Sequence, residues 1–391
     1  MTTPSLQFDV AVIGGGIIGS AAAYFLLKED PSLAVCVIEP DPTYEFASAL
    51  RASGGCRVQF TCPENIEMSR FSIDFIKAFE STMATEGRPA PVDWVEGGYL
   101  FIVPPENVTA LERNVATQQA HGCVVDLLSP YELKAKFPSM RVGDLGAAAH
   151  TPHDGWCDPN GLLWGFRRKA VELGATYIKA RFESAEVDAT KVKVIVLDSG
   201  QRIEATSFVN AAGAWSGVVA ERFGMRLPVV PMRRFEHYFT AGSPIEHLPY
   251  VKDVARLAFR SEGTGFSGGL VDGSAQRGFN FDVDHDYFEN VVWPAVAHRF
   301  PAFEAAKCHR TWSGLYEVNE LDGNPVIGAW SSLPNLYTVS GFSGHGMMHA
   351  PAAGRGIAEL IVHGEYRSID LTRLGYERIK ASAPYAEQGI L

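Results

Sequence analysis

Three glycines near the start of the chain have the spacing of a phosphate-binding turn. Gly14, Gly16 and Gly19 fit the pattern G-x-G-x-x-G and follow the apolar run 10–13. In such a turn the first glycine permits a sharp bend, the second lets the backbone approach a diphosphate, and the third lets a helix pack on the sheet. Glu39 ends the next apolar strand, where a carboxylate can accept hydrogen bonds from a ribose. These residues predict a dinucleotide site; the alternative is a purely structural turn.

A second glycine-rich turn lies near the other end of the chain. The run 341–346 reads Gly-Phe-Ser-Gly-His-Gly, after the apolar strand 336–339 and before a helix-like stretch that reaches residue 362. The N-terminus of a helix offers unpaired N–H groups and about half a positive charge. Two such turns predict a long, partly anionic ligand between them, and 208–216 is a third strand-turn-helix junction.

Composition narrows the class of protein. The chain has 391 residues, of which 46% are hydrophobic, and 34 basic against 45 acidic residues give a net charge of −11. Without a basic stretch, nucleic acid is not an expected partner. Residues 1–5 lack the features of a signal peptide, and six scattered cysteines are typical of reduced thiols, so we expect a cytoplasmic protein. The acidic charge and the absence of an amphipathic basic segment predict no association with membranes.

The order of predicted elements indicates a mixed α/β fold (α+β mixed) with two domains. Strand-turn-helix junctions at both ends predict a discontinuous Rossmann-like domain over 1–80, 140–225 and 325–391. Aromatic strand-like runs and glycine-rich turns predict an inserted antiparallel-sheet substrate domain over 81–139 and 226–324.

The motifs together resemble the D-amino-acid oxidase superfamily of FAD-dependent oxidoreductases, in particular its sarcosine oxidase and glycine oxidase branch. The matching segments are 12–19, 209–215, 322–328 and 341–346. The loop 52–60, followed by 63–65, resembles a subgroup that includes mitochondrial FAD-domain proteins of the respiratory assembly type.

The resemblance implies roles for individual residues around FAD. Glu39 is expected at the adenosine ribose, and Phe182 is expected to reach the adenine through its backbone. The residues expected around the diphosphate and the rest of the cofactor are Gly14, Gly16, Ile17, Ile18, Gly19, Ala47, Ser48, Arg57, Ala212, Gly213, Trp215 and Gly314. The residues expected at the pyrimidine edge of the flavin are Gly344, His345, Gly346, Met347 and Met348.

The chain departs from the family pattern at several positions. The segment 313–317 has no cysteine, and Cys308 is too early to substitute, so we expect noncovalent FAD. Met348 stands where some relatives have a lysine that binds the substrate carboxylate, and Tyr316 stands where others have an arginine. The strand 265–270 also lacks the lysine that related oxidases use with oxygen.

Four side chains are candidates for catalysis or substrate binding. Arg57 follows two glycines and could bind a carboxylate with two hydrogen bonds or compensate flavin charge; the alternative is a surface ion pair. His345 could contact substrate or cap a turn, and Tyr316 could direct its hydroxyl to substrate or be buried in a strand. Arg233, or its neighbour Arg234 on the opposite strand face, could replace the missing carboxylate anchor; the alternative is a solvated strand edge.

The resemblance implies FAD-dependent oxidation of a secondary amine or amino acid. The expected substrate is a small anionic amine, such as an N-substituted glycine or an iminodiacetate-like dicarboxylate. Hydride transfer to flavin N5 and hydrolysis of the imine are then followed by reoxidation with O2, which gives H2O2. The alternatives are a dehydrogenase that passes electrons to a quinone or flavoprotein, and a FAD-binding assembly or scaffold protein. The sequence predicts no metal site.

Overall fold

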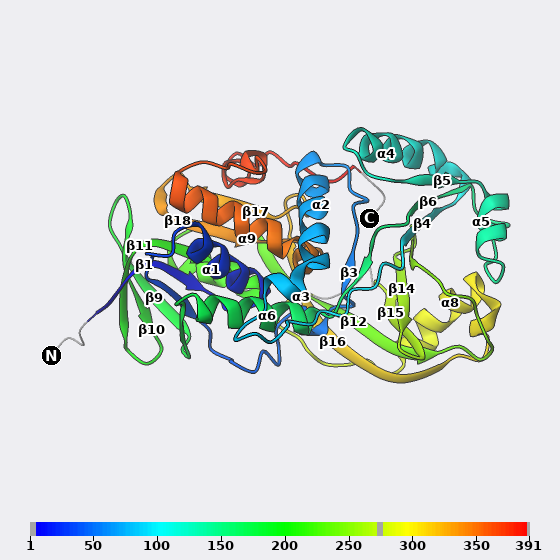
Figure 1. The fold of residues 1–391 in the computed structure, drawn as a ribbon, viewed down its shortest axis with the longest axis horizontal. Helices are drawn as coiled ribbons and strands as arrows, with labels where there is room; N and C mark the ends of the chain where they lie inside the picture. Colours follow the sequence, from blue (N-terminus) through cyan, green and yellow to red (C-terminus); the bar gives the residue numbers. More distant parts are fainter. Residues whose placement is uncertain (1–4, 272–276, 389–391) are drawn as a thin grey trace.

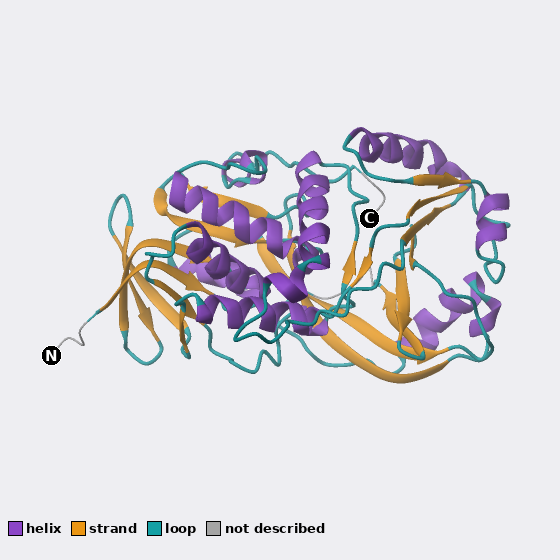
Figure 2. Ribbon diagram, in the orientation of Figure 1, coloured by secondary structure: helices purple, strands orange, loops and turns teal. Residues whose placement is uncertain are grey.

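The computed structural model describes residues 5–271 and 277–388, which form two large sheets with helices packed around them (Figures 1 and 2). Each sheet has eight strands in this part of the chain. Together they confirm the predicted mixed α/β fold. No helix in these two ranges combines the length and the apolar character needed to span a membrane.

The first sheet has a parallel centre whose strands end at the predicted glycine turns. β1 (Leu6–Ile13) lies between β2 (Val35–Ile38) and β11 (Arg202–Asn210), both parallel to it. Ile13 is in register with Asn210, so the turns after β1 and β11 lie side by side. The other strands of this sheet are β8 (Thr176–Ile178), β9 (Phe182–Val187), β10 (Val192–Leu197), β17 (Val326–Trp330) and β18 (Leu333–Ser340).

Two helices pack closely against each other beside this sheet. α1 (Ile17–Glu29) is buried from Ile17 to Leu27, which explains its long uncharged sequence. It contacts α9 (Gly346–His363), where a Cβ on Gly354 would lie 2.8 Å from Ala21. The further helical segments around this domain are η1 (Ala49–Arg51), α2 (Pro63–Lys77), α3 (Phe79–Thr82), α6 (Pro159–Glu172), η3 (Gly213–Trp215), α7 (Ser216–Arg222), η6 (Thr372–Leu374) and α10 (Glu377–Lys380).

The second sheet has the order β16-β12-β15-β14-β13-β4-β6-β5. Its longest strands, β12 (Val229–Thr240) and β16 (Lys307–Asn319), pair antiparallel and curve from the middle of the molecule along its lower right side in Figure 1. The other strands are β4 (Tyr99–Val103), β5 (Asp126–Leu128), β6 (Ala147–Thr151), β13 (Tyr250–Asp253), β14 (Leu257–Glu262) and β15 (Gly265–Leu270). Its helical segments are η2 (Pro105–Asn107), α4 (Val108–Ala120), α5 (Pro130–Lys136), η4 (Phe288–Val292), α8 (Trp293–Arg299) and η5 (Pro301–Phe303). A separate small sheet joins β3 (Gly55–Cys56) and β7 (Gly155–Trp156).

Two details differ from the sequence predictions. The boundary predicted at residue 140 precedes β6, although β6 pairs with β4 and β5 in the second sheet. The strand that carries Arg233 and Arg234 is not an edge strand over its whole length, because β12 pairs with β16 from Val229 to Thr240 and with β15 at His237, Tyr238 and Phe239. Sequence alternation alone does not reveal which strands become neighbours.

A carboxylate near the end of the chain caps α2 and provides a test of stability. The N-cap residue of α2, Cys62, has no side-chain cap of its own. Glu387 instead accepts hydrogen bonds from the Thr61 N–H at 2.6 Å and the Cys62 N–H at 3.2 Å. Since an anion at a helix N-terminus is stabilising, Glu387→Gln is expected to lower the free energy of unfolding by about 1 kcal/mol in urea titrations. Glu365→Gln, at a side chain that is 72% exposed, is the control and should change it by less than about 0.5 kcal/mol. Equal effects of the two variants would contradict this assignment.

Candidate functional site

A cavity of about 710 Å³ is lined by residues of both large sheets. It contains the first glycine turn, at Gly14 and Gly16, and the second, at Gly344 and Gly346. The structure therefore brings the two ends of the sequence to one site. The other predicted site residues that line it are Ile17, Ile18, Glu39, Ala47, Ser48, Arg57, Phe182, Ala212, Gly213, Trp215, Gly314, Tyr316, His345, Met347 and Met348.

The first turn leaves an open space before the N-terminus of α1. Gly16 is the N-cap, and no heavy atom lies within 4 Å of the position that its Cβ would occupy. Gly14 has φ +101°, and a Cβ there would lie 2.5 Å from the carbonyl oxygen of Ala211. Gly19 does not line the cavity; its Cβ would lie 1.9 Å from the Gly14 oxygen, so it permits helix packing. Such a turn can hold a diphosphate on free N–H groups.

Glu39 is held in a fixed orientation beside this turn. Its carboxylate accepts hydrogen bonds from the Gly15 N–H at 2.8 Å and the Asp41 N–H at 2.9 Å. Burial raises the pKa of Glu39, while these two hydrogen bonds act in the opposite direction. Each carboxylate oxygen can accept a second hydrogen bond, as a ribose would require. Phe182 also lines the cavity, and its carbonyl accepts a hydrogen bond from Arg222.

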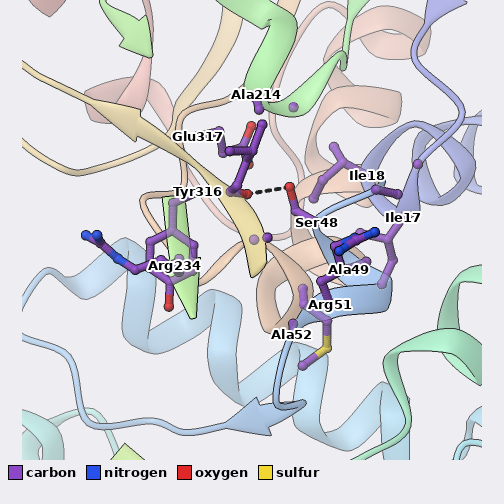
Figure 3. Close-up of a pocket in the computed structure, with 18 of the residues that line it drawn as sticks. Ile17, Ile18, Ser48, Ala49, Arg51, Ala52, Ala214, Arg234, Tyr316 and Glu317 are labelled. Atoms are coloured by element: carbon purple, nitrogen blue, oxygen red, sulfur yellow. Dashed lines mark hydrogen bonds between the residues drawn. The ribbon is translucent and has the colours of Figure 1, made fainter. Parts of the chain in front are cut away.

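The loop that carries Ser48 is tied to the long strand β16. Figure 3 shows the Ser48 hydroxyl directed to the Leu315 carbonyl, a hydrogen bond of 2.6 Å. Trp215 is 36% exposed and stacks on Phe279 with a centroid distance of 5.2 Å. Ser48, Trp215 and Gly314 all line the cavity.

The second turn places the N-terminus of α9 against the ring of Tyr316. Gly344 has φ +110°, and a Cβ there would lie 2.4 Å from that ring, so only glycine fits. Burial raises the pKa of Tyr316, which keeps its hydroxyl protonated. The Arg234 guanidinium lies 5.0 Å from the same ring, as Figure 3 illustrates. Tyr316 is therefore a neutral hydrogen-bond donor at this end of the cavity.

His345 is the N-cap of α9 and is held by a second buried histidine. Its Nδ1 lies 3.1 Å from Nδ1 of His349, whose Nε2 lies 2.8 Å from the Ser69 hydroxyl. Burial lowers the pKa of His345 to about 3, with smaller contributions from the charges of Arg57 and Lys252. The imidazole is thus neutral at physiological pH and can act as a hydrogen-bonding group but not as a cation.

The two arginine candidates have different positions. Arg57 is only 4% exposed, lines the cavity and lies with its guanidinium 4.0 Å from the Phe60 ring. It donates a hydrogen bond to the Gln59 carbonyl. Arg233 does not line the cavity: it donates to the Asp282 carbonyl at 3.1 Å. Arg234 lines the cavity in its place, as the alternation along β12 predicts for the opposite face.

The sequence analysis did not identify Lys252, Glu236 and Glu317, which line this cavity. Lys252 on β13 is half-buried, and burial together with the charges of Arg57 and Arg256 holds its pKa well below the usual range. Burial raises the pKa of Glu236 and of Glu317 to about 7 in each case. The described residues contain no cluster of three or more side chains suited to a metal ion.

Comparison with known proteins identifies the family of this arrangement. A family model described as DAO, FAD dependent oxidoreductase, matches residues 9–360. FAD-dependent oxidoreductase domain-containing protein 1 of Xenopus laevis is 34% identical over 431 aligned residues, covering 99% of this chain and 86% of that protein. The open space at Gly16, the oriented Glu39 and the two helix N-termini fit FAD.

Two other relatives extend the comparison to named activities. Sarcosine oxidase subunit beta of Arthrobacter is 26% identical over 94% of this chain and 90% of that protein. The crystal structure of L-proline dehydrogenase from P. horikoshii superposes with a TM-score of 0.85 at 26% identity, covering 98% of this chain and all of that one. The match extends over both domains.

Proposed function

We propose, since the chain belongs to the DAO family of FAD-dependent oxidoreductases, that it oxidises an amino acid whose nitrogen is a secondary amine. The observation that carries this proposal is a single cavity that combines two helix N-termini with the basic side chains of Arg57 and Lys252. When bound, FAD supplies the acceptor for the two electrons that leave the substrate. The chain's own residues bind, orient and enclose the reactants.

The two glycine turns are assigned to the two ends of FAD. Gly14 and Gly16 would hold the diphosphate at the N-terminus of α1, and Glu39 the ribose. The N-terminus of α9, at Gly346, would stabilise negative charge at the flavin edge in the manner of an oxyanion hole. Noncovalent attachment remains a prediction.

Arg57 and Lys252 are proposed to attract the substrate carboxylate. Both line the cavity, and burial, followed by the charges of Arg57 and Arg256, lowers the pKa of Lys252. An anion bound beside these groups would stabilise their charged forms. The hydroxyl of Tyr316 can add a neutral donor. An N-substituted glycine has one carboxylate that these groups can bind, and an iminodiacetate-like dicarboxylate has two.

The residues of the cavity promote the reaction by positioning the substrate. The nitrogen must be unprotonated, because its lone pair assists the loss of hydride from the neighbouring carbon. Holding the carboxylate fixes the position of that carbon. The resulting imine hydrolyses to an oxoacid and an amine.

Oxygen is proposed as the electron acceptor, with H2O2 as product. The similarity to L-proline dehydrogenase and to mitochondrial sarcosine dehydrogenases favours a second candidate, a dehydrogenase with the same first half-reaction. Peroxide release in air with substrate supports the oxidase. Reduction by substrate without peroxide, and with turnover restored by an artificial acceptor, supports the dehydrogenase. A cytoplasmic location remains a prediction.

The experiment that tests the amine half-reaction is anaerobic addition of candidate amines to the FAD-bound protein. Bleaching of the flavin band near about 450 nm by an N-substituted glycine or a related secondary amine supports the proposal. A FAD-binding scaffold would retain the band with every amine while still losing it with dithionite.

A further inference from the structure

Glu236 is a cavity-lining carboxylate that the binding of FAD and of a substrate carboxylate leaves without a role. It lies on β12, opposite Trp312 in the register with β16. The Ser267 hydroxyl on β15 donates to its Oε1 at 2.7 Å, which fixes one carboxylate oxygen. Burial raises the pKa of both Tyr250 and Tyr316, and the charge of Glu236 adds to this shift. Because Tyr316 packs on Gly344, Glu236 belongs to the same end of the cavity as the N-terminus of α9.

The charged groups around Glu236 leave it able to exchange a proton. Arg260 on β14 directs its guanidinium to the carbonyls of Ser53 and Ser261 and to the Glu262 carboxylate. Burial raises the pKa of Glu236 to about 7, the Ser267 hydrogen bond and Arg260 oppose this, and Glu262 adds to it. Near neutral pH both protonation states are therefore populated.

Glu236 and Lys252 are placed to receive the two charges of a zwitterion. β12 and β13 are separated by β15 and β14, so their backbones lie about 14 Å apart. Between them the cavity is lined by Ala258 and Gly269, which pair with each other and occupy little space. An amino acid in this space would place its carboxylate at Lys252, where the anion favours the protonated amine, and its nitrogen at Glu236.

We propose that Glu236 accepts the proton of the substrate's ammonium group and thereby prepares the amine for oxidation. This inference rests on the proposed function. The N–H bond of the ammonium breaks, its electron pair stays on nitrogen as the lone pair, and an O–H bond forms on Glu236. The neutral amine then loses hydride to FAD and becomes an iminium ion.

The test compares wild type with Glu236→Gln by the rate of anaerobic flavin bleaching across pH. Glutamine keeps the size of the side chain and can still accept the Ser267 hydrogen bond, but it cannot take the proton. At pH 7 the rate divided by the substrate dissociation constant should fall about 100-fold, the lower end for a general base. At pH 10 the deficit should shrink to about threefold or less, because more substrate arrives already neutral.

Ser267→Ala provides a second variant that keeps the carboxylate. The wild-type rate should rise with pH through a pKa of about 7, as the carboxylate forms. Since the Ser267 hydrogen bond lowers that pKa, its loss should move the rise to higher pH while the plateau is retained. FAD content and thermal unfolding, measured in parallel, show that each variant is folded.

The outcomes separate this inference from the proposed function. If Glu236→Gln is bleached with the wild-type rate and pH profile, or is slowed by the same factor at every pH, Glu236 is not the proton acceptor, although the amine half-reaction stands. If no amine bleaches wild type at any pH, the proposed function and this inference are both overturned. A loss of rate in Glu236→Gln that disappears as pH rises supports the proposal.

Discussion

Replacing Gly16 with valine is expected to weaken FAD binding about 100-fold, which corresponds to about 2.7 kcal/mol. The backbone of Gly16 has φ −61°, and the space around its Cβ position is open, so the side chain itself strains nothing in the protein. It would instead occupy the space where the diphosphate approaches the N-terminus of α1. The dissociation constant is measured by quenching of FAD fluorescence on adding apoprotein.

Gly19→Ala is the matched control within the same turn. Its Cβ would lie 1.9 Å from the Gly14 oxygen, so α1 or β1 must move, and the apoprotein should lose about 1 to 3 kcal/mol of stability. Gly16→Val should leave the urea midpoint of the apoprotein unchanged. If Gly16→Val binds FAD as well as wild type, the open space at Gly16 is not the diphosphate site.

Replacing Arg57 with alanine is expected to slow anaerobic reduction by substrate about 100-fold or more with FAD still bound. Arg57 is almost fully buried beside the cavity, and losing one partner of a buried charge pair costs about 2 to 5 kcal/mol. The loss should appear mainly as a higher substrate dissociation constant, read from the dependence of the bleaching rate on substrate concentration. Arg57→Lys should recover part of the rate, because it restores charge without the planar fork.

Arg233→Ala is the control for this substitution. Arg233 is on the same strand as a cavity residue, but its guanidinium binds the Asp282 carbonyl and does not line the cavity. Its reduction rate should stay within about twofold of wild type, less than 0.5 kcal/mol. A large loss in Arg233→Ala with little change in Arg57→Ala would reverse the assignment.

The parts of the site that are local in sequence could be predicted. Gly14, Gly16 and Glu39 belong to one strand-turn-helix-strand unit, so their spacing alone predicts their geometry. The second turn, at Gly344, was predicted for the same reason. The second turn lies beside the first because β11 pairs with both β1 and β18. The third strand-turn-helix junction, at 208–216, was the signal for this arrangement.

The substrate side of the cavity could not be predicted in this way. Lys252 and Glu236 come from strands whose neighbours are distant in sequence: β13 pairs with β4, about 150 residues earlier in the chain. Alternation along β12 correctly separates Arg233 from Arg234, but which face meets the cavity depends on the whole sheet order. A lysine was expected on the strand 265–270, but Lys252 lies two strands away from it in the same sheet.

Anaerobic titration of the FAD-bound protein with secondary amino acids tests the central claim most directly. We expect at least one N-substituted glycine or related secondary amine to bleach the flavin band at about 450 nm, and we expect air or an added acceptor to restore it. Persistence of the band with every such amine between pH 7 and pH 10, in protein that dithionite still reduces, would contradict the account.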